Sequence, residues 1–292
     1  MATSRTQRDV WVYVGIGAMV SALVLFSLVP LAMGLWQPRP AADGGVNGAT
    51  PLENQAFGYQ LVLEREPDNV NALQGLLEIR LQQKNLTAAI APLERLGQIK
   101  ADQVQYRILL AQLKTQLEDN AGAAKVYREI LIQSPYNIQA LKGLSGLYAQ
   151  QERPAEAVAI VQNAITQAIK AQTGAPGTVP PDQLTSLQLL LGEIYLSQNR
   201  PDQAIAIYEA ASKVNGDDFR PVLAQAQVMA QTGKLKEADP FFQQAIMLAP
   251  VQYKDSIKKI ALQVTNQALA TQNSAPEAGA PSPTPAPILK SE

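Results

Sequence analysis

The stretch LLLGEIYLSQNRPDQAIAIYEAA, residues 189–211, decides the fold of this chain. Apolar residues recur there at helical spacing on both sides of a break at residues 199–201; they are Leu191, Ile194 and Tyr195 before the break and Ala204, Ile205, Tyr208 and Ala211 after it. Two helices that cross closely need small side chains between them, and Gly192 and Ala204 meet that need. The stretch therefore predicts one helical hairpin.

The same small-residue pairing recurs along the chain at the same separation of twelve residues. The further pairs are Ala111 with Ala123, Ser145 with Ala157, and Ala226 with Ala238. The alanines of the second helices fix the period. Ala89, Ala123 and Ala157 are 34 residues apart, the next step, to Ala204, is 47 residues, and the step to Ala238 is again 34 residues. The chain is therefore built from repeats, with an insertion of 13 residues in the longer step.

The repeat resembles the tetratricopeptide repeat family, whose units carry Leu-Gly and Tyr on one helix and Ala, an aromatic residue and Pro on or after the next. The residues that carry the resemblance are Leu191, Gly192, Tyr195, Ala204, Tyr208 and Ala211 in one unit; Ala226, Ala238, Phe242, Ala245 and Pro250 in the last; Ala111, Ala123, Tyr127 and Pro135 in the second; and Leu141, Leu144, Tyr148 and Ala157 in the third. The resemblance implies an all-α fold, a right-handed α-solenoid of about five hairpins with capping helices over residues 52–270.

Residues 10–36 are predicted to form a transmembrane helix that follows a polar flank, residues 1–9. The 26 residues from 10 to 35 include no charged side chain. At about 1.5 Å per residue they exceed the hydrocarbon core of a bilayer, which is about 30 Å thick. Trp11, Tyr13 and Trp36 stand near the two ends, where amphipathic rings favour the headgroup level. A cleaved signal peptide is the competing interpretation, but its apolar region is shorter.

The orientation of this helix is predicted from the charges that flank it. Arg5, Arg8 and the amino terminus precede it, whereas Arg39 alone follows it closely. Since positive charge is retained on the cytoplasmic side, we expect a single-pass membrane protein with a cytoplasmic N-terminus and the repeats on the opposite side.

Three further segments are predicted from composition. Residues 37–51 are rich in Pro, Gly and small polar residues and are expected to be a flexible linker. Residues 172–182 are expected to be an insertion loop between the third and fourth hairpins. Residues 271–292 are rich in Pro and Ala and are expected to be a disordered tail.

Composition argues against catalysis. The chain contains no histidine and no cysteine, so the usual general base, the commonest zinc ligands and a thiolate nucleophile are all missing. No glycine-rich phosphate loop follows a predicted strand. The net charge of −1 with no dense basic run does not suit a nucleic-acid partner. We expect no enzyme activity, no cofactor, no metal, no small-molecule substrate and no nucleic acid.

The resemblance also implies a binding site, because the first helix of each tetratricopeptide hairpin lines an inner groove that binds extended or helical peptides. The residues expected to face that groove are Asn71, Gln74, Glu78, Gln105, Gln112, Gln139, Lys142, Glu193, Arg220, Gln227 and Gln231. Glutamine dominates this set. Members of the family that clamp a carboxylate tail use a cluster of basic residues, for which Lys142 and Arg220 are the nearest candidates here, so an acidic tail is not the expected ligand.

The sequence thus predicts a membrane-tethered scaffold or adaptor that binds a protein or peptide partner, by analogy with anchored repeat proteins that assist assembly of membrane or envelope complexes. Two alternatives stay open. The chain is a self-associating module whose groove receives its own tail or a second copy, or it is an accessory or regulatory subunit of an envelope enzyme.

Overall fold

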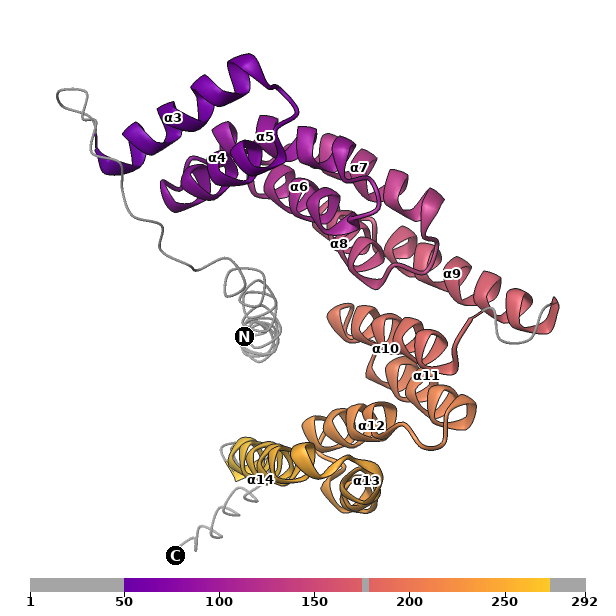
Figure 1. The fold of residues 1–292 in the computed structure, drawn as a ribbon. Helices are drawn as coiled ribbons and strands as arrows, with labels where there is room; N and C mark the ends of the chain where they lie inside the picture. The colour runs from indigo at the N-terminus through magenta and orange to yellow at the C-terminus, as the bar shows by residue number, and fades with distance from the viewer. Residues whose placement is uncertain (1–49, 175–178, 274–292) are drawn as a thin grey trace, which may run out of the picture. The chain divides into compact units, whose positions relative to one another are not determined.

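The computed structural model describes residues 50–174 and 179–273, and within them the chain is entirely helical (Figure 1). Twelve α-helices and no strand are found in these residues. The chain divides into two compact units, Met1–Arg200 and Pro201–Glu292. The prediction of an all-α repeat fold is confirmed for the described residues.

Most of the described helices are similar in length, whereas α9 and α14 are longer, with 21 and 23 residues. In the first unit they are α3 (Pro51–Arg65), α4 (Val70–Gln82), α5 (Leu86–Ile99), α6 (Val104–Gln116), α7 (Asn120–Gln133), α8 (Ile138–Gln150), α9 (Pro154–Gly174) and α10 (Pro181–Ser197). In the second unit they are α11 (Pro201–Val214), α12 (Phe219–Gln231), α13 (Leu235–Leu248) and α14 (Val251–Asn273). Five successive pairs, from α4–α5 to α12–α13, follow the predicted repeat.

The turn inside each of these pairs is the same. One residue there has a left-handed backbone conformation, and these residues are Lys84 (φ 55°), Glu118 (63°), Glu152 (57°), Asn199 (58°) and Gly233 (85°). They are separated by 34, 34, 47 and 34 residues, which is the period of the small-residue pairs. In every case the next amide donates to a carbonyl five residues earlier, as Asn85 N does to Arg80 O at 2.8 Å. The turn closes the last helical turn and sends the chain back.

Side-chain caps start many of the helices. Asn69, Asn85 and Asn137 each accept a hydrogen bond from the backbone N–H three residues later, at 2.9 to 3.1 Å. Thr50 and Glu53 cap the start of α3 reciprocally. These caps satisfy amides that have no partner within their helix.

The small residues of the repeat lie where the structure is most tightly packed. Ala111, Ala123, Ala157, Ala204 and Ala226 have no exposed surface. The larger side chains that surround them in the first unit include Leu93, Leu96, Ile130 and Leu144, which are also fully buried. In the second unit α12 packs against α11, α13 and α14. Close approach of helices, made possible by alanine, therefore holds each unit together.

The insertion loop, predicted at residues 172–182, is shorter than predicted. Helix α9 continues to Gly174 and α10 already begins at Pro181, so both edges of the predicted loop are helical. Proline at the first helical position has a favourable φ and lacks only an amide that would have no partner there, which explains the early start of α10. Residues 175–178 lie outside the described residues. The boundaries at the two ends differ similarly, since α3 includes Pro51 and α14 reaches Asn273.

The predicted transmembrane helix, residues 10–36, lies outside the described residues, as do its flank and most of the linker. Among the helices that the structure describes, none combines the length and the apolar character needed to cross a bilayer.

Candidate functional site

The first helices of the four hairpins that begin in the first unit lie next to one another. Gln74 Nε2 on α4 donates to the Tyr106 hydroxyl on α6 at 2.6 Å, α6 packs on α8, and Lys142 Nζ on α8 lies 2.8 Å from Glu193 Oε2 on α10. Figure 1 shows α4, α6 and α8 in one layer and α5, α7 and α9 in a second. We call the outward side of α4, α6, α8 and α10 the first-helix face.

Eight of the residues predicted to line a groove are on these helices. Asn71, Gln105, Gln139 and Glu193 are exposed, and Gln74, Glu78, Gln112 and Lys142 are half-buried. None belongs to the hydrophobic core of the first unit. Their side chains are therefore available for a surface role, which is the first requirement of a binding site.

One pair of opposite charges on the first-helix face is compensated within it. Lys142 and Glu193 form an ion pair although they are 51 residues apart, and their side chains are 42% and 47% exposed. Gln82 Nε2 donates to Glu78 Oε1 at 3.2 Å. A half-exposed ion pair adds little to stability, but it reduces the attraction of either residue for a charged ligand.

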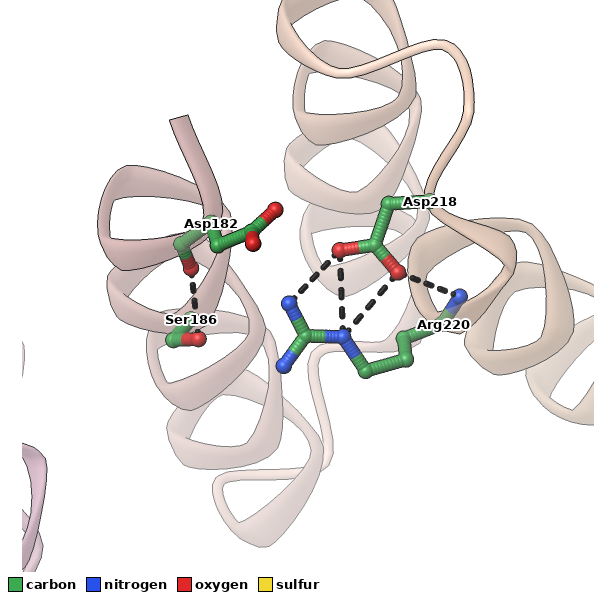
Figure 2. Close-up of polar contacts among 4 residues, drawn as sticks. All are labelled: Asp182, Ser186, Asp218 and Arg220. Atoms are coloured by element: carbon green, nitrogen blue, oxygen red, sulfur yellow. Dashed lines mark hydrogen bonds and ion pairs between the residues drawn. The ribbon is translucent and has the colours of Figure 1, made fainter. Parts of the chain in front are cut away.

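The second unit contains the three other predicted residues, Arg220, Gln227 and Gln231, all on α12. Figure 2 shows the guanidinium of Arg220 held by the carboxylate of Asp218, with Nε 3.0 Å from both oxygens and Nη2 2.6 Å from Oδ2. Asp218 also caps α12, because its Oδ1 accepts from the backbone amide of Arg220 at 2.9 Å. A forked pair of this kind orients Arg220 and neutralises much of its charge.

Figure 2 also shows a polar contact near the start of α10, where Ser186 Oγ donates to the main-chain carbonyl of Asp182 at 2.7 Å. This bond from a serine to the carbonyl four residues earlier is common inside helices. It involves no side chain of an acid and provides no nucleophile with an adjacent base.

Two tyrosines were not among the predicted groove residues but take part in contacts between helices. Tyr106 accepts from Gln74, and Tyr195 accepts from Gln162 Nε2 of α9 at 3.0 Å. The Arg200 guanidinium lies over the ring of Tyr195, 4.8 Å from its centroid. The helical spacing of Tyr195 indicated only that it belongs to the apolar side of its helix, and Tyr106 was not singled out. A tyrosine hydroxyl at the edge of a helix pair also needs a polar partner, and that was the available signal.

Two acidic residues of the described chain, Glu94 and Asp119, form ion pairs with the same lysine. Lys114 lies between Glu94 Oε1 at 3.1 Å and Asp119 Oδ2 at 3.5 Å, and these two carboxylates hold its pKa above the usual value although burial opposes them. No group of three His, Cys, Asp or Glu side chains that could hold a metal ion is found in the described residues. The described residues of the first-helix face offer hydrogen-bond donors and acceptors, and they show no recognisable catalytic geometry.

A family model for the tetratricopeptide repeat matches residues 108–172 and 189–252. These two ranges, which together hold fewer than half of the 292 residues, match the repeat pattern of that family. The match includes part of each unit and leaves out residues 173–188, where the 47-residue step of the sequence period falls. The small-residue pairs, the left-handed turns and the family match thus identify the same repeated hairpins.

Individual proteins resemble the chain more distantly. Cellulose synthase operon protein C of Komagataeibacter xylinus is 31% identical over 122 residues, which are 41% of this chain and 9% of that protein. Yeast Tom70 shares 14% identity with a TM-score of 0.48, over 80% of this chain and 46% of that one. The Pseudomonas aeruginosa pilF structure shares 17% identity with a TM-score of 0.40, over 78% of this chain and 96% of that one.

Proposed function

We propose that this protein is a membrane-tethered tetratricopeptide scaffold that binds a segment of a partner protein on its first-helix face and performs no turnover. The observation that carries the proposal is the side-by-side packing of α4, α6, α8 and α10, with a row of side chains that the core does not use. Tetratricopeptide repeats bind protein or peptide partners, and the face offers hydrogen-bonding groups on adjacent rigid helices.

The tether is the second part of the proposal. It is supported by the uncharged run of residues 10–35 and by the aromatic residues at its ends. Holding the repeats near a bilayer raises their effective concentration toward a membrane-bound partner without any new contact. The flanking arginines favour a cytoplasmic N-terminus with the repeats on the other side. Assembly of a membrane or envelope complex is the biological role that this layout suits best.

Site-specific photo-crosslinking in the native membrane tests the binding face. A photoreactive residue at Gln112 or at Gln139 on the first-helix face is compared with one at Lys125 or Glu129, which are exposed on the second helix α7. We expect the same crosslinked product from Gln112 and Gln139 and none from the two control positions. Equal yields at all four positions, or products from α7 alone, would show that the first-helix face is not the binding site.

Two membrane experiments test the tether separately. The full-length chain should stay with membranes after a carbonate wash, and the repeats should be protected from protease in sealed vesicles of cytoplasmic-side-out orientation. Release by carbonate would disprove the anchor, and digestion of the repeats in such intact vesicles would reverse the proposed topology. Neither result depends on the identity of the partner.

The two alternative functions make different predictions. A self-associating module grows in mass with concentration in light scattering, and this growth is lost when residues 271–292 are removed. An accessory subunit of an envelope enzyme co-purifies with one companion at fixed stoichiometry. The scaffold proposal is favoured where the crosslinked product is a different protein and purification gives no fixed complex.

A further inference from the structure

Helix α3 exposes large apolar side chains on the side that does not pack against the repeats. Its inner side packs on α4, with Ala56 buried and Leu63 partly buried. Phe57, Leu61 and Val62 are 50%, 43% and 39% exposed. Packing within the described chain therefore does not account for these three residues.

The other hairpins show that this exposure is not a general property of second helices. α3 stands in the place of a second helix, because Tyr59 fills the space at Gly75 as Tyr127 does at Gly143, two periods later. The residues equivalent to Leu61 in the five complete hairpins are polar or small; they are Arg95, Glu129, Asn163, Ala210 and Gln244. Those equivalent to Val62 are at most 5% exposed; they are Leu96, Ile130, Ala164, Ala211 and Ala245. The apolar surface of α3 is thus specific to this helix.

The three exposed residues share one side of α3. At about 100° per residue they fall within a sector of about 140°. The six residues of this sector include no acid and are here called the outer α3 face; they are Asn54, Phe57, Gly58, Leu61, Val62 and Arg65. A Cβ added at Gly58 would meet no atom within 4 Å, so the middle of the face is open.

The chemistry of this face matches the boundary between the headgroups and the acyl chains of a bilayer. A helix that lies in this boundary places its apolar side chains toward the acyl chains and its basic ones among the phosphates. Arg65 is exposed, and a guanidinium pairs well with a phosphate. Glu53 and Glu64 border the face beside Phe57. Because these two carboxylates repel anionic lipids, zwitterionic headgroups suit the face better.

The place of α3 in the chain keeps it near such a surface. Fourteen residues, 37–50, separate it from the predicted transmembrane segment, residues 10–36. A flexible linker of that length has an average end-to-end distance of about 20 Å. Short tethers of this kind give effective concentrations in the millimolar range. A contact made by only three apolar side chains is then strong enough to be populated.

We propose that the outer α3 face lies on the surface of the bilayer that anchors the chain, with Phe57, Leu61 and Val62 in the interface. This inference rests on the proposed function, whose tether it uses, and adds a second membrane contact to it. Since α3 packs on α4, the contact holds the first unit in one orientation toward the membrane. The first-helix face is then presented to a membrane-bound partner at a constant angle.

Quenching of a fluorophore by lipid tests this contact in the full-length chain. The chain contains no cysteine, so one introduced cysteine can be labelled selectively. Gly58→Cys carries the label on the outer α3 face, and Gly146→Cys carries it on α8, where an added Cβ also meets no atom within 4 Å. Each protein is reconstituted in phosphatidylcholine vesicles with or without a lipid that has a nitroxide near its headgroup. We expect the nitroxide to lower the fluorescence at residue 58 about twofold and to leave that at residue 146 unchanged.

Substitutions in the Gly58→Cys chain separate the lipid contact from the fold. The double variant Phe57→Gln, Leu61→Gln should lose the quenching, while its thermal midpoint of unfolding shifts by no more than about 3 °C because both side chains are half-exposed. The matched control is Ile132→Gln, which removes an isoleucine of α7 that is 80% exposed. This control should be quenched as strongly as the parent.

Three results would overturn the proposal: no quenching at residue 58, equal quenching at residues 58 and 146, or full quenching in the double variant. A label at residue 58 that is shielded from aqueous iodide but not quenched by the lipid would show that a second copy of the chain covers the face instead. The carbonate wash reports on the tether separately. A chain that resists carbonate without quenching has an anchor and no α3 contact, whereas release by carbonate overturns both proposals.

Discussion

The ring of Tyr127, on α7, lies against the backbone of Gly143 on α8, so that a Cβ added to Gly143 would be 2.2 Å from the ring Cζ atom. The same relation joins Tyr59 on α3 to Gly75 on α4, where the distance to Cζ would be 2.3 Å. The two pairs are 68 residues apart, or two periods of the repeat. A tyrosine of one helix thus occupies the space left by a glycine of the next hairpin, and α3 packs as a second helix does.

We predict that Gly143→Ala destabilises the protein although alanine is the better helix former. Helix propensity alone would stabilise by about 1 kcal/mol, but the added methyl group must displace the Tyr127 ring, and overpacking of this kind costs about 1–3 kcal/mol. Urea unfolding followed by circular dichroism measures the balance. The control Gly146→Ala has open space around its Cβ and should gain about 0.5–1 kcal/mol. A gain in both variants would show that Tyr127 moves aside freely.

A second prediction concerns the left-handed turns. Glu118 has φ 63°, a conformation that costs a residue with a Cβ about 1–2 kcal/mol. Glu118→Gly should therefore stabilise the α6–α7 hairpin by about 0.5–1 kcal/mol after the greater chain entropy of glycine is subtracted. The reverse change, Gly233→Ala, should destabilise the α12–α13 hairpin by a similar amount. Measuring the free energy of unfolding of both variants tests this prediction.

The control for this pair is Glu129→Gly, because Glu129 is exposed within α7 and has no need of a left-handed conformation. It should lose about 1 kcal/mol. If Glu118→Gly also loses stability, the turn geometry does not contribute the strain that its φ angle indicates.

The bounds of the hairpins were predictable from the sequence because a helix pair repeats its turn and its small residues at a constant interval. Ala89, Ala123 and Ala157 set that interval, and the left-handed residues Lys84 and Glu118 keep it. Each of these features is local, so a single sequence reveals it. The insertion interrupts the period, and the helical ends at Gly174 and Pro181 could not be placed by repetition.

The contacts of the candidate site were not predictable in the same way. The resemblance to tetratricopeptide repeats implied that Gln74 and Lys142 face the groove. Their partners, Tyr106 and Glu193, are 32 and 51 residues away, and the choice of partner depends on how far adjacent hairpins slide along each other. Arg220 pairs with Asp218 two residues earlier, a local contact that cap chemistry could have indicated.

A third prediction follows from the burial of Tyr127, which raises the pKa of its hydroxyl to about 12. The folded protein favours the protonated phenol, whose pKa in the unfolded chain is about 10. The stabilisation is therefore complete below pH 10 and is lost as the pH rises to 12. Two pKa units correspond to about 2–3 kcal/mol.

The Tyr127→Phe variant tests this linkage because it has no hydroxyl to ionise. Between pH 9 and pH 12, the free energy of unfolding of the wild type should fall by about 2–3 kcal/mol relative to that of the variant. The difference in tyrosinate absorbance between wild type and variant should develop near pH 12 in the folded proteins and near pH 10 in the unfolded chains. Parallel pH profiles of the two proteins would contradict the prediction.

Thr185, on α10, leads to a fourth prediction. It is fully buried near the start of α10, and its Oγ1 has no hydrogen-bond partner in the part of the chain that the structure describes. A buried hydroxyl without a partner costs about 1–3 kcal/mol. Thr185→Val keeps the shape and removes the hydroxyl, so it should stabilise the protein by about 1 kcal/mol.

Thr115→Val is the matched control, since Thr115 Oγ1 donates to the carbonyl of Ala111 at 2.9 Å. Loss of that bond should make the variant neutral or less stable by up to about 1 kcal/mol. Opposite signs for the two valine variants, measured by urea unfolding, are expected. A loss of stability in Thr185→Val would mean that the hydroxyl finds a partner in solution, and an ordered water at the start of α10 would then be the group to look for, because a buried water satisfies such atoms where the chain does not.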